Sequence, residues 1–196
     1  MVLPWYAGPA ELAEKEFESI LSLGPVLNMA GPTPYTKINA GSDIACIKNG
    51  YKRPCYSCLT SSPPSIATYK TLFRDWIDLA NEHHDFVHGV VLAEYYGWKV
   101  ASEKDDMSTA YPWRKAKVSL MAGVEYTKDE LNKTAEKHGK QFKDTIMEGM
   151  IYVNHSSGDE EDLTTVYGSE ERLERLRGLK RKWDPTGTFS FYNAIR

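Results

Sequence analysis

Every second residue of the stretch 115–126 is apolar, and most of the residues between them are polar. Because successive side chains of a β-strand point to opposite faces, this period of two predicts a strand with one buried face. The apolar face consists of Ala116, Val118, Leu120, Ala122, Val124 and Tyr126. Strands of a parallel sheet are usually buried on both faces and read as continuous apolar runs, so the alternation favours an antiparallel sheet.

A second strand is predicted over residues 86–96, which are rich in Val, Phe and Tyr. One face is small and apolar and suits a cover of helices: Val87, Gly89, Val91, Ala93 and Tyr95. The other face carries His88 and Glu94, which stand about 20 Å apart along a strand and cannot act as one pair. A buried carboxylate is costly unless it is paired or functional, so Glu94 is either a site residue or the partner of Lys117 or Arg114.

Helical spacing and start signals predict helices over residues 9–22, 62–82, 127–148 and 169–183. Thr127 and Glu130 match a capping box, and Ser169 is a predicted N-cap. Short β-like runs cover residues 26–29, 35–38 and 150–153, whereas the irregular residues 39–64 predict a covering loop. Together these elements predict one α+β domain over residues 1–196, an antiparallel β-sheet with helices packed on one face.

Charge and composition exclude several classes of function. A formal net charge of -3 gives no electrostatic footprint for nucleic acid or anionic membrane. No run of about 18 apolar residues is present, and the first residues lack signal-peptide features, so a cytoplasmic protein is expected. Cys55 and Cys58 have the CxxC spacing without a second ligand pair, so no metal site is predicted. Together with Cys46 they are expected to be reduced thiols, and a labile disulfide is the alternative.

Asn154 and His155 follow the short apolar run at 150–153. An imidazole titrates near neutral pH, so His155 is the leading candidate for a general acid or base. The alternative is a strand-end histidine that is hydrogen-bonded to the backbone. Asn154 either binds a carbonyl group or caps a turn, and Tyr152 is expected to pack rather than to react.

The C-terminal region carries an ordered series of short motifs: Tyr152-Val-Asn-His155, Tyr167-Gly168, Arg172-Leu173, Leu179-Lys180, Trp183-Asp184-Pro185 and Phe189. This series resembles the end of FAD-linked oxidases of the berberine-bridge-enzyme type. Pieces further upstream are similar to the substrate domain of that family: residues 5–8, Leu23-Gly24-Pro25, Pro34-Tyr35 and residues 110–114. The resemblance covers nearly the whole chain and implies a substrate domain in which helices back an antiparallel sheet.

The resemblance does not extend to the FAD-binding domain of the family. Neither a GxGxxG segment after a strand nor a P-loop is found, so the sequence offers no cradle for the pyrophosphate of a flavin. No cofactor is therefore expected, and FAD only if a partner chain supplies it. His155 also stands where the family usually has a tyrosine that is often invoked as an acid or base beside the flavin.

The sequence thus favours a flavin-free, redox-neutral cyclase, pericyclase or isomerase that acts on a hydrophobic secondary-metabolite intermediate. The alternatives are a fragment or subunit of an FAD-dependent oxidoreductase whose FAD-binding half is on another chain, and a non-catalytic binding protein. His155 and Glu94 are the expected catalytic residues. The expected substrate-binding residues are His88, Tyr96, Trp113, Arg114, Ser119, Met121, Tyr152 and Asn154. An exposed apolar sheet face predicts a homodimer.

Overall fold

The computed structural model of the protein describes residues 1–46, 50–146, 149–156, 158, 160 and 162–195, without the side chains of residues 41–46. The chain divides into two compact units, Met1–Asn49 and Gly50–Arg196. Each unit has its own elements, and the single domain expected over residues 1–196 stays a prediction.

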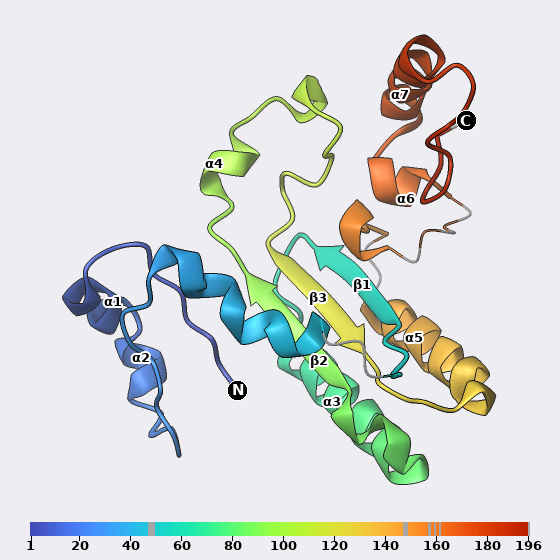
Figure 1. Ribbon diagram of the computed structural model, residues 1–196. Coiled ribbons are helices and arrows are strands. Elements are labelled where there is room, and N and C mark those ends of the chain that lie inside the picture. The colour runs from blue at the N-terminus through green and yellow to red at the C-terminus, as the bar shows by residue number, and fades with distance from the viewer. Residues whose placement is uncertain (47–49, 147–148, 157, 159, 161, 196) are drawn as a thin grey trace. The chain divides into compact units, whose positions relative to one another are not determined.

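The regular elements in the described part of the N-terminal unit are all helices (Figure 1). Its elements are α1 (Ala10–Glu16), α2 (Glu18–Leu21) and the 3-10 helix η1 (Tyr35–Cys46). The helix expected over residues 9–22 is confirmed with a break at Phe17, whose φ of -98° and ψ of 10° leave the helical region. The strands expected at 26–29 and 35–38 are wrong, since the first run lies in no element and the second starts η1. Pro32 and Pro34 between them lack the N–H that a strand ladder needs.

The described part of the C-terminal unit is built on a three-stranded antiparallel sheet in the order β1-β3-β2 (Figure 1). The strands are β1 (Cys55–Thr60), β2 (Val90–Tyr95) and β3 (Val118–Gly123). The α-helices are α3 (Ile66–Glu82), α4 (Lys99–Ser102), α5 (Asn132–Ile146), α6 (Thr164–Tyr167) and α7 (Glu170–Trp183). The 3-10 helices are η2 (His84–His88), η3 (Asp106–Ser108), η4 (Asp129–Leu131) and η5 (Val153–His155). β3 is central, because Ala122 pairs with Tyr56 on one side and Val91 on the other.

Helices α3 and α5 cover one face of this sheet (Figure 1). Their apolar residues meet the inward-facing strand residues in one buried cluster: Cys58, Leu72, Val118, Leu120, Phe142 and Ile146. Full burial of an aliphatic or aromatic side chain stabilises a fold by about 1.5–3 kcal/mol, so this layer holds the unit together. The predicted α+β class, with helices packed on one face of an antiparallel sheet, is confirmed.

Both predicted long strands are shorter than the alternating pattern suggests. β3 pairs only over Val118–Gly123, although Tyr126 beyond its end is still buried. β2 begins at Val90, because η2 occupies the preceding residues and the N–H of Gly89 donates to the carbonyl of Phe86 at 2.9 Å. The prediction that His88 lies on a strand face is therefore wrong.

The strand β1 lies inside residues 39–64, where the sequence predicts a covering loop, so that prediction is wrong for residues 55–60. Ser57 and Thr60 are each only 2% exposed and are as deeply buried as Leu59. Because polar residues occupy buried positions, the strand shows no alternation of polarity, and its pattern does not reveal it.

Serine caps start two of the long helices. The Oγ of Ser169 accepts a hydrogen bond from the N–H of Arg172 at 3.2 Å, which confirms the predicted N-cap of α7. Ser65 caps α3 in the same way. The capping box predicted at residues 127–130 is not formed, because η4 occupies this stretch and α5 begins only at Asn132.

Gly168 joins α6 to α7 with a φ of +89°, a conformation that side chains with a Cβ rarely adopt. A Cβ at this position would lie 2.5 Å from the Cβ of Pro112 and 2.7 Å from the Nη1 of Arg172. We expect Gly168→Ala to lower the free energy of unfolding, measured in urea, by about 2 kcal/mol. Gly178→Ala within α7 is the control, because its nearest neighbour is 3.8 Å away and alanine favours helix. Equal destabilisation by the two variants would contradict this account.

Candidate functional site

The segment that carries Asn154 and His155 is a bridge and a turn rather than the predicted strand. The N–H of Leu59 donates to the carbonyl of Met150 at 2.8 Å, and the chain then bends through η5. The hydroxyl of Ser57 donates to the carbonyl of His155 at 2.8 Å. Because Ser57 alternates with the helix-facing residues of β1, η5 is held on the sheet face opposite α3 and α5. We call this face the tip face.

The side chains of the turn differ in how far they are engaged. The amide of exposed Asn154 donates to the hydroxyl of Tyr152 at 3.0 Å, so the amide bonds within its own turn. His155 is half-buried, and its Nδ1 is buried without a hydrogen-bond partner in the described part of the chain. Within the described residues, Nδ1 therefore does not make the hydrogen bond to the backbone that the alternative, purely structural interpretation of His155 requires.

Aromatic rings extend from His155 across the tip. The imidazole meets the ring of Tyr152 edge to face, with centroids 5.1 Å apart, and Tyr152 meets Tyr111 in the same way at 5.8 Å. Tyr152 packs as expected. The sequence prediction omits Tyr111, although its position beside Pro112 and Trp113 in the family-like segment was a signal for it. Burial is the main cause that raises the pKa of Tyr111, followed by the proximity of Tyr152.

Glu94 and Tyr96 project from the end of β2 toward the same tip. The phenol of Tyr96 shares a hydrogen bond with Glu94, and its pKa is raised to about 12 by burial, by the Glu94 carboxylate and by nearby Tyr152. Within the described residues, the partner of Glu94 is thus a phenol, and no ion pair with Lys117 or Arg114 is formed. Glu94 contacts the phenol of Tyr96, and Tyr152 connects this pair to the imidazole of His155, so the tip holds several groups that can take up or release a proton.

Two further predicted residues lie on the tip face of β3. Ser119 stands opposite Glu94 on β2, and Met121 stands opposite Leu92 on β2 and Ser57 on β1. Ser119 is 4% exposed, and its Oγ has no hydrogen-bond partner within the described residues. The register therefore places the Ser119 hydroxyl directly opposite Glu94, and the Met121 thioether one pair further along the same face.

Trp113 and Arg114 hold the surrounding chain. The indole N–H of Trp113 donates to the carbonyl of Ile151 at 2.8 Å and fixes the chain that leads into η5. Arg114 donates to the hydroxyl of Thr109 at 2.6 Å. His88 is exposed and precedes the first residue of β2, whereas Glu94 is near the end of that strand. The structure therefore does not bring His88 to the other predicted residues.

We define the tip cluster as Glu94, Tyr96, Tyr111, Tyr152 and His155.

A phenol next to a negative charge resists ionisation, so Glu94→Gln is expected to lower the pKa of Tyr96 from about 12. The pKa should stay above 10, because burial is the largest cause of the shift. The raised pKa favours the folded state below pH 10, and this contribution is lost as the pH rises through about 12. Ultraviolet titration of tyrosinate, with Tyr96→Phe to assign the signal, measures the shift; an unchanged pKa would contradict the Glu94–Tyr96 contact.

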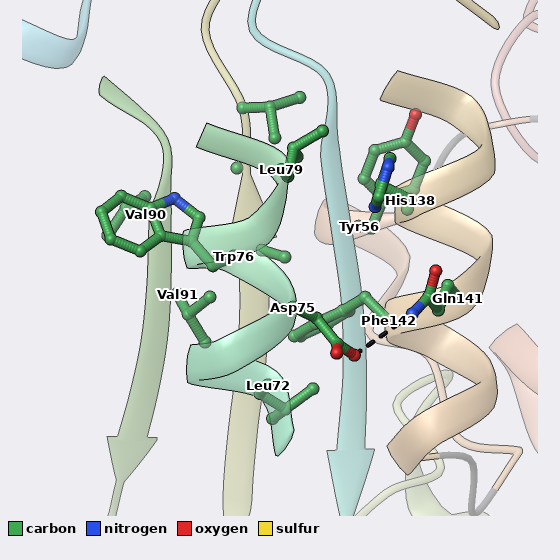
Figure 2. Close-up of a pocket in the computed structure, with 14 residues that line it drawn as sticks. Tyr56, Leu72, Asp75, Trp76, Leu79, Val90, Val91, His138, Gln141 and Phe142 are labelled. Carbon is green, nitrogen blue, oxygen red and sulfur yellow. Dashed lines mark hydrogen bonds between the residues drawn. The ribbon is translucent and has the colours of Figure 1, made fainter. Parts of the chain in front are cut away.

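A small cavity lies on the opposite face of the sheet, between α3, α5 and the strands (Figure 2). Trp76, Leu79 and Phe142 line it, and two further lining residues are hydrogen-bonded to each other, Gln141 donating to Asp75 at 3.2 Å. His138 also lines it, and burial, followed by Lys137, lowers the pKa of that imidazole. The volume of about 40 Å³ has room for a few water molecules and is far below that of a substrate pocket. The tip cluster is therefore the better candidate site.

Thiol, metal and membrane features add no second candidate. Cys55 is a free, half-buried thiol whose pKa burial raises, against a smaller opposing effect of Lys143. The side chain of Cys46 lies outside the described residues. Where the structure describes the chain, no three His, Cys, Asp or Glu side chains gather as metal ligands. None of the described helices combines the length and apolar character that a bilayer crossing requires.

The sequence of this chain is similar to a known protein family and to several curated proteins. Residues 151–196 match the family model described as "Berberine and berberine like". The FAD-linked oxidoreductase OXR2 of Pyricularia oryzae is 28% identical over 99% of this chain, which covers 41% of OXR2. The FAD-linked oxidoreductase hasG of Aspergillus fumigatus is 30% identical over 93% of this chain, which covers 42% of hasG. The chain is a relative of the berberine-bridge-type FAD-linked oxidoreductases.

The fold agrees with this relationship. The flavoenzyme CrmK, described as part of shunt product recycling in caerulomycin biosynthesis, superposes with a TM-score of 0.72 at 20% identity. That match covers 96% of this chain and 42% of CrmK. The chain thus spans about two fifths of the length of these FAD-linked oxidoreductases. The flavin-free cyclase or isomerase expected from the sequence finds no support in these relatives, whereas the alternative of a part of an FAD-dependent oxidoreductase agrees with them.

The names of the relatives imply FAD, whose diphosphate typically binds the free N–H groups of a helix N-terminus. In the described residues, Ser65 and Ser169 accept hydrogen bonds from the first turns of α3 and α7. Glu170 and Glu171 add negative charge at α7, and residues 129–130 do so before α5. Anionic side chains and filled caps oppose a diphosphate, so the described residues do not fit a whole FAD.

Proposed function

We propose that this chain is the substrate-side portion of an FAD-linked oxidoreductase, and that residues outside the chain bind the FAD. The tip cluster is the observation that carries the proposal. It gathers a carboxylate, three phenols and an imidazole on the sheet face that α3 and α5 leave available. The relatives are FAD-linked oxidoreductases about two and a half times as long, which supports a division of the site between this chain and another portion.

In this proposal, Glu94 is the group that accepts a proton from the substrate. Its hydrogen bond to Tyr96 orients the carboxylate, and the buried Ser119 hydroxyl stands opposite it without a partner in the described residues. The unpaired Nδ1 of His155 offers a second place for a proton. A positioned acid or base typically contributes 10²–10⁴-fold to a rate, so Glu94 is the residue on which turnover should depend most.

The proposed substrate is a hydrophobic, ring-bearing intermediate of secondary metabolism. The edge-to-face rings of Tyr111 and Tyr152 offer aromatic contact, and Met121 is an adaptable apolar neighbour on the same face. Trp113 and the Ser57 hydroxyl act through the backbone of the tip rather than by contact with substrate. The homodimer expected through the sheet face stays a prediction.

Reconstitution with the FAD-binding portion of a full-length relative tests this function. The two polypeptides are co-expressed, and the substrate of that relative is added without oxygen. We expect the visible absorbance of the flavin to bleach only when this chain is present. Equal bleaching by the FAD-binding portion alone would refute a substrate-side role for this chain.

A further inference from the structure

The two edge strands of the sheet, β1 and β2, differ in how far the rest of the described chain covers them. At the β1 edge, the N–H of Leu59 bonds to Met150, and residues 57–60 are buried. At the other edge, Val90 is 51% and Tyr95 is 58% exposed. Natural edge strands are commonly protected by lysine, proline or a bulge. The β2 sequence, Val-Val-Leu-Ala-Glu-Tyr, has neither lysine nor proline, and its one charged residue, Glu94, is hydrogen-bonded to Tyr96, so this edge lacks most of the usual protection.

Helix α3 continues the apolar surface beyond this edge. Figure 2 shows the ring of Trp76 reaching from α3 over β2 beside Val90. A Cβ on Gly89 would lie 2.9 Å from the Nε1 of Trp76, so the absence of a side chain there permits the close approach. Phe73 stacks on Trp76 with centroids 6.3 Å apart and is itself 62% exposed. The strand edge thus adjoins an aromatic pair in which Phe73 is exposed and Trp76 is half-buried.

We define the edge surface as Val90, Val91, Tyr95, Phe73 and Trp76, and we propose that a β-strand of the FAD-binding portion pairs with it. The strand would add antiparallel or parallel to β2 through main-chain hydrogen bonds. Its side chains on the helix face would be apolar, because they would cover Phe73 and Trp76. This inference rests on the proposed function, and the length of the relatives supports it, since nearly three fifths of each lies outside the matched region.

Amide hydrogen exchange, read out by mass spectrometry on the full chain, tests the pairing. The chain is compared alone and co-purified with the FAD-binding portion of a full-length relative. We expect peptides spanning β2 to exchange at least about tenfold more slowly in the complex, since alternate amides of an edge strand point away from its neighbour. Val90→Lys should weaken the complex at least about tenfold, because a charge at the edge opposes pairing. Val100→Lys is the control, at an exposed valine on α4.

The outcomes separate this inference from the proposed function. A flavin-containing complex with unchanged β2 exchange and no effect of Val90→Lys would overturn the edge pairing and leave the proposed function standing. Failure of any flavin-containing complex to form would overturn both. If β2 already exchanges slowly in the chain alone, and does so only at high protein concentration, a second copy of this chain pairs with the edge. That result would contradict the proposal. Because exchange is compared within the wild-type chain, the test holds even if Val90→Lys folds poorly.

Discussion

Arg172→Ala is expected to lower the free energy of unfolding by about 3 kcal/mol. The side chain is only 3% exposed, and it donates to the carbonyl of Tyr167 at 3.1 Å and to the carbonyl of Asp106. The Asp106 carboxylate lies 3.4 Å from the same guanidinium. Removal of this side chain leaves two carbonyls without their donor and opens space in a buried region, and both effects are destabilising. Urea denaturation monitored by circular dichroism measures the loss.

The effect should reach the candidate site as well. Arg172 fixes η3, which lies shortly before Tyr111 in the chain, so its loss should also mobilise that ring. Arg175→Ala is the matched control on the same helix, because Arg175 is exposed and donates to the carbonyl of Met107 at 2.6 Å. An exposed bond of this kind contributes only about 0.5–1 kcal/mol. Equal losses for the two variants would show that buried Arg172 has no special structural role.

Glu94→Gln is expected to slow substrate-dependent flavin reduction by about 100-fold or more in the reconstituted protein. Glutamine keeps the shape of the side chain and can still hydrogen-bond to Tyr96, but it cannot accept a proton at neutral pH. The rate is measured in a single turnover without oxygen, so that chemistry is separated from product release.

His88→Ala provides the control for this variant. His88 is exposed on η2, away from the tip cluster, so its loss should leave the single-turnover rate unchanged. A full rate in Glu94→Gln would remove Glu94 from the proposed chemistry. A similar loss in Glu94→Gln and His88→Ala would point to a general effect on β2 rather than to proton transfer.

The fold class was predictable because every second residue of the central strand is apolar and faces the helices. Val118 and Leu120 face the helices as expected, and the apolar stripe of α3 is long enough to identify. β1 escaped prediction because its neighbours bury Ser57 and Thr60, and local pattern carries no information about such tertiary burial. A turn at residues 84–88 also interrupted the second strand, because tertiary packing of Phe86 outweighed the β propensity of this segment.

Part of the candidate site was predictable, because the alternation of side chains along a strand determines the sheet face on which each residue lies. This alternation placed Glu94 and Ser119 on one face, and the pairing register makes them neighbours. The approach of η5 to that face depends on Ser57 and Trp113, whose partners are distant in sequence. Sequence pattern therefore indicated His155 without its surroundings, and it could not place Tyr111 against Tyr152. His88 was misplaced because one turn of 3-10 helix moves a residue off a strand face.

Retention of FAD through gel filtration tests most directly whether this chain is a substrate-side portion. The purified chain is mixed with FAD, alone or together with the FAD-binding portion of a full-length relative, and the flavin absorbance of the protein peak is measured. We predict a colourless peak for the chain alone, and a yellow peak that contains both polypeptides when the FAD-binding portion is present. One tightly held FAD per chain, without that portion, would contradict the proposal.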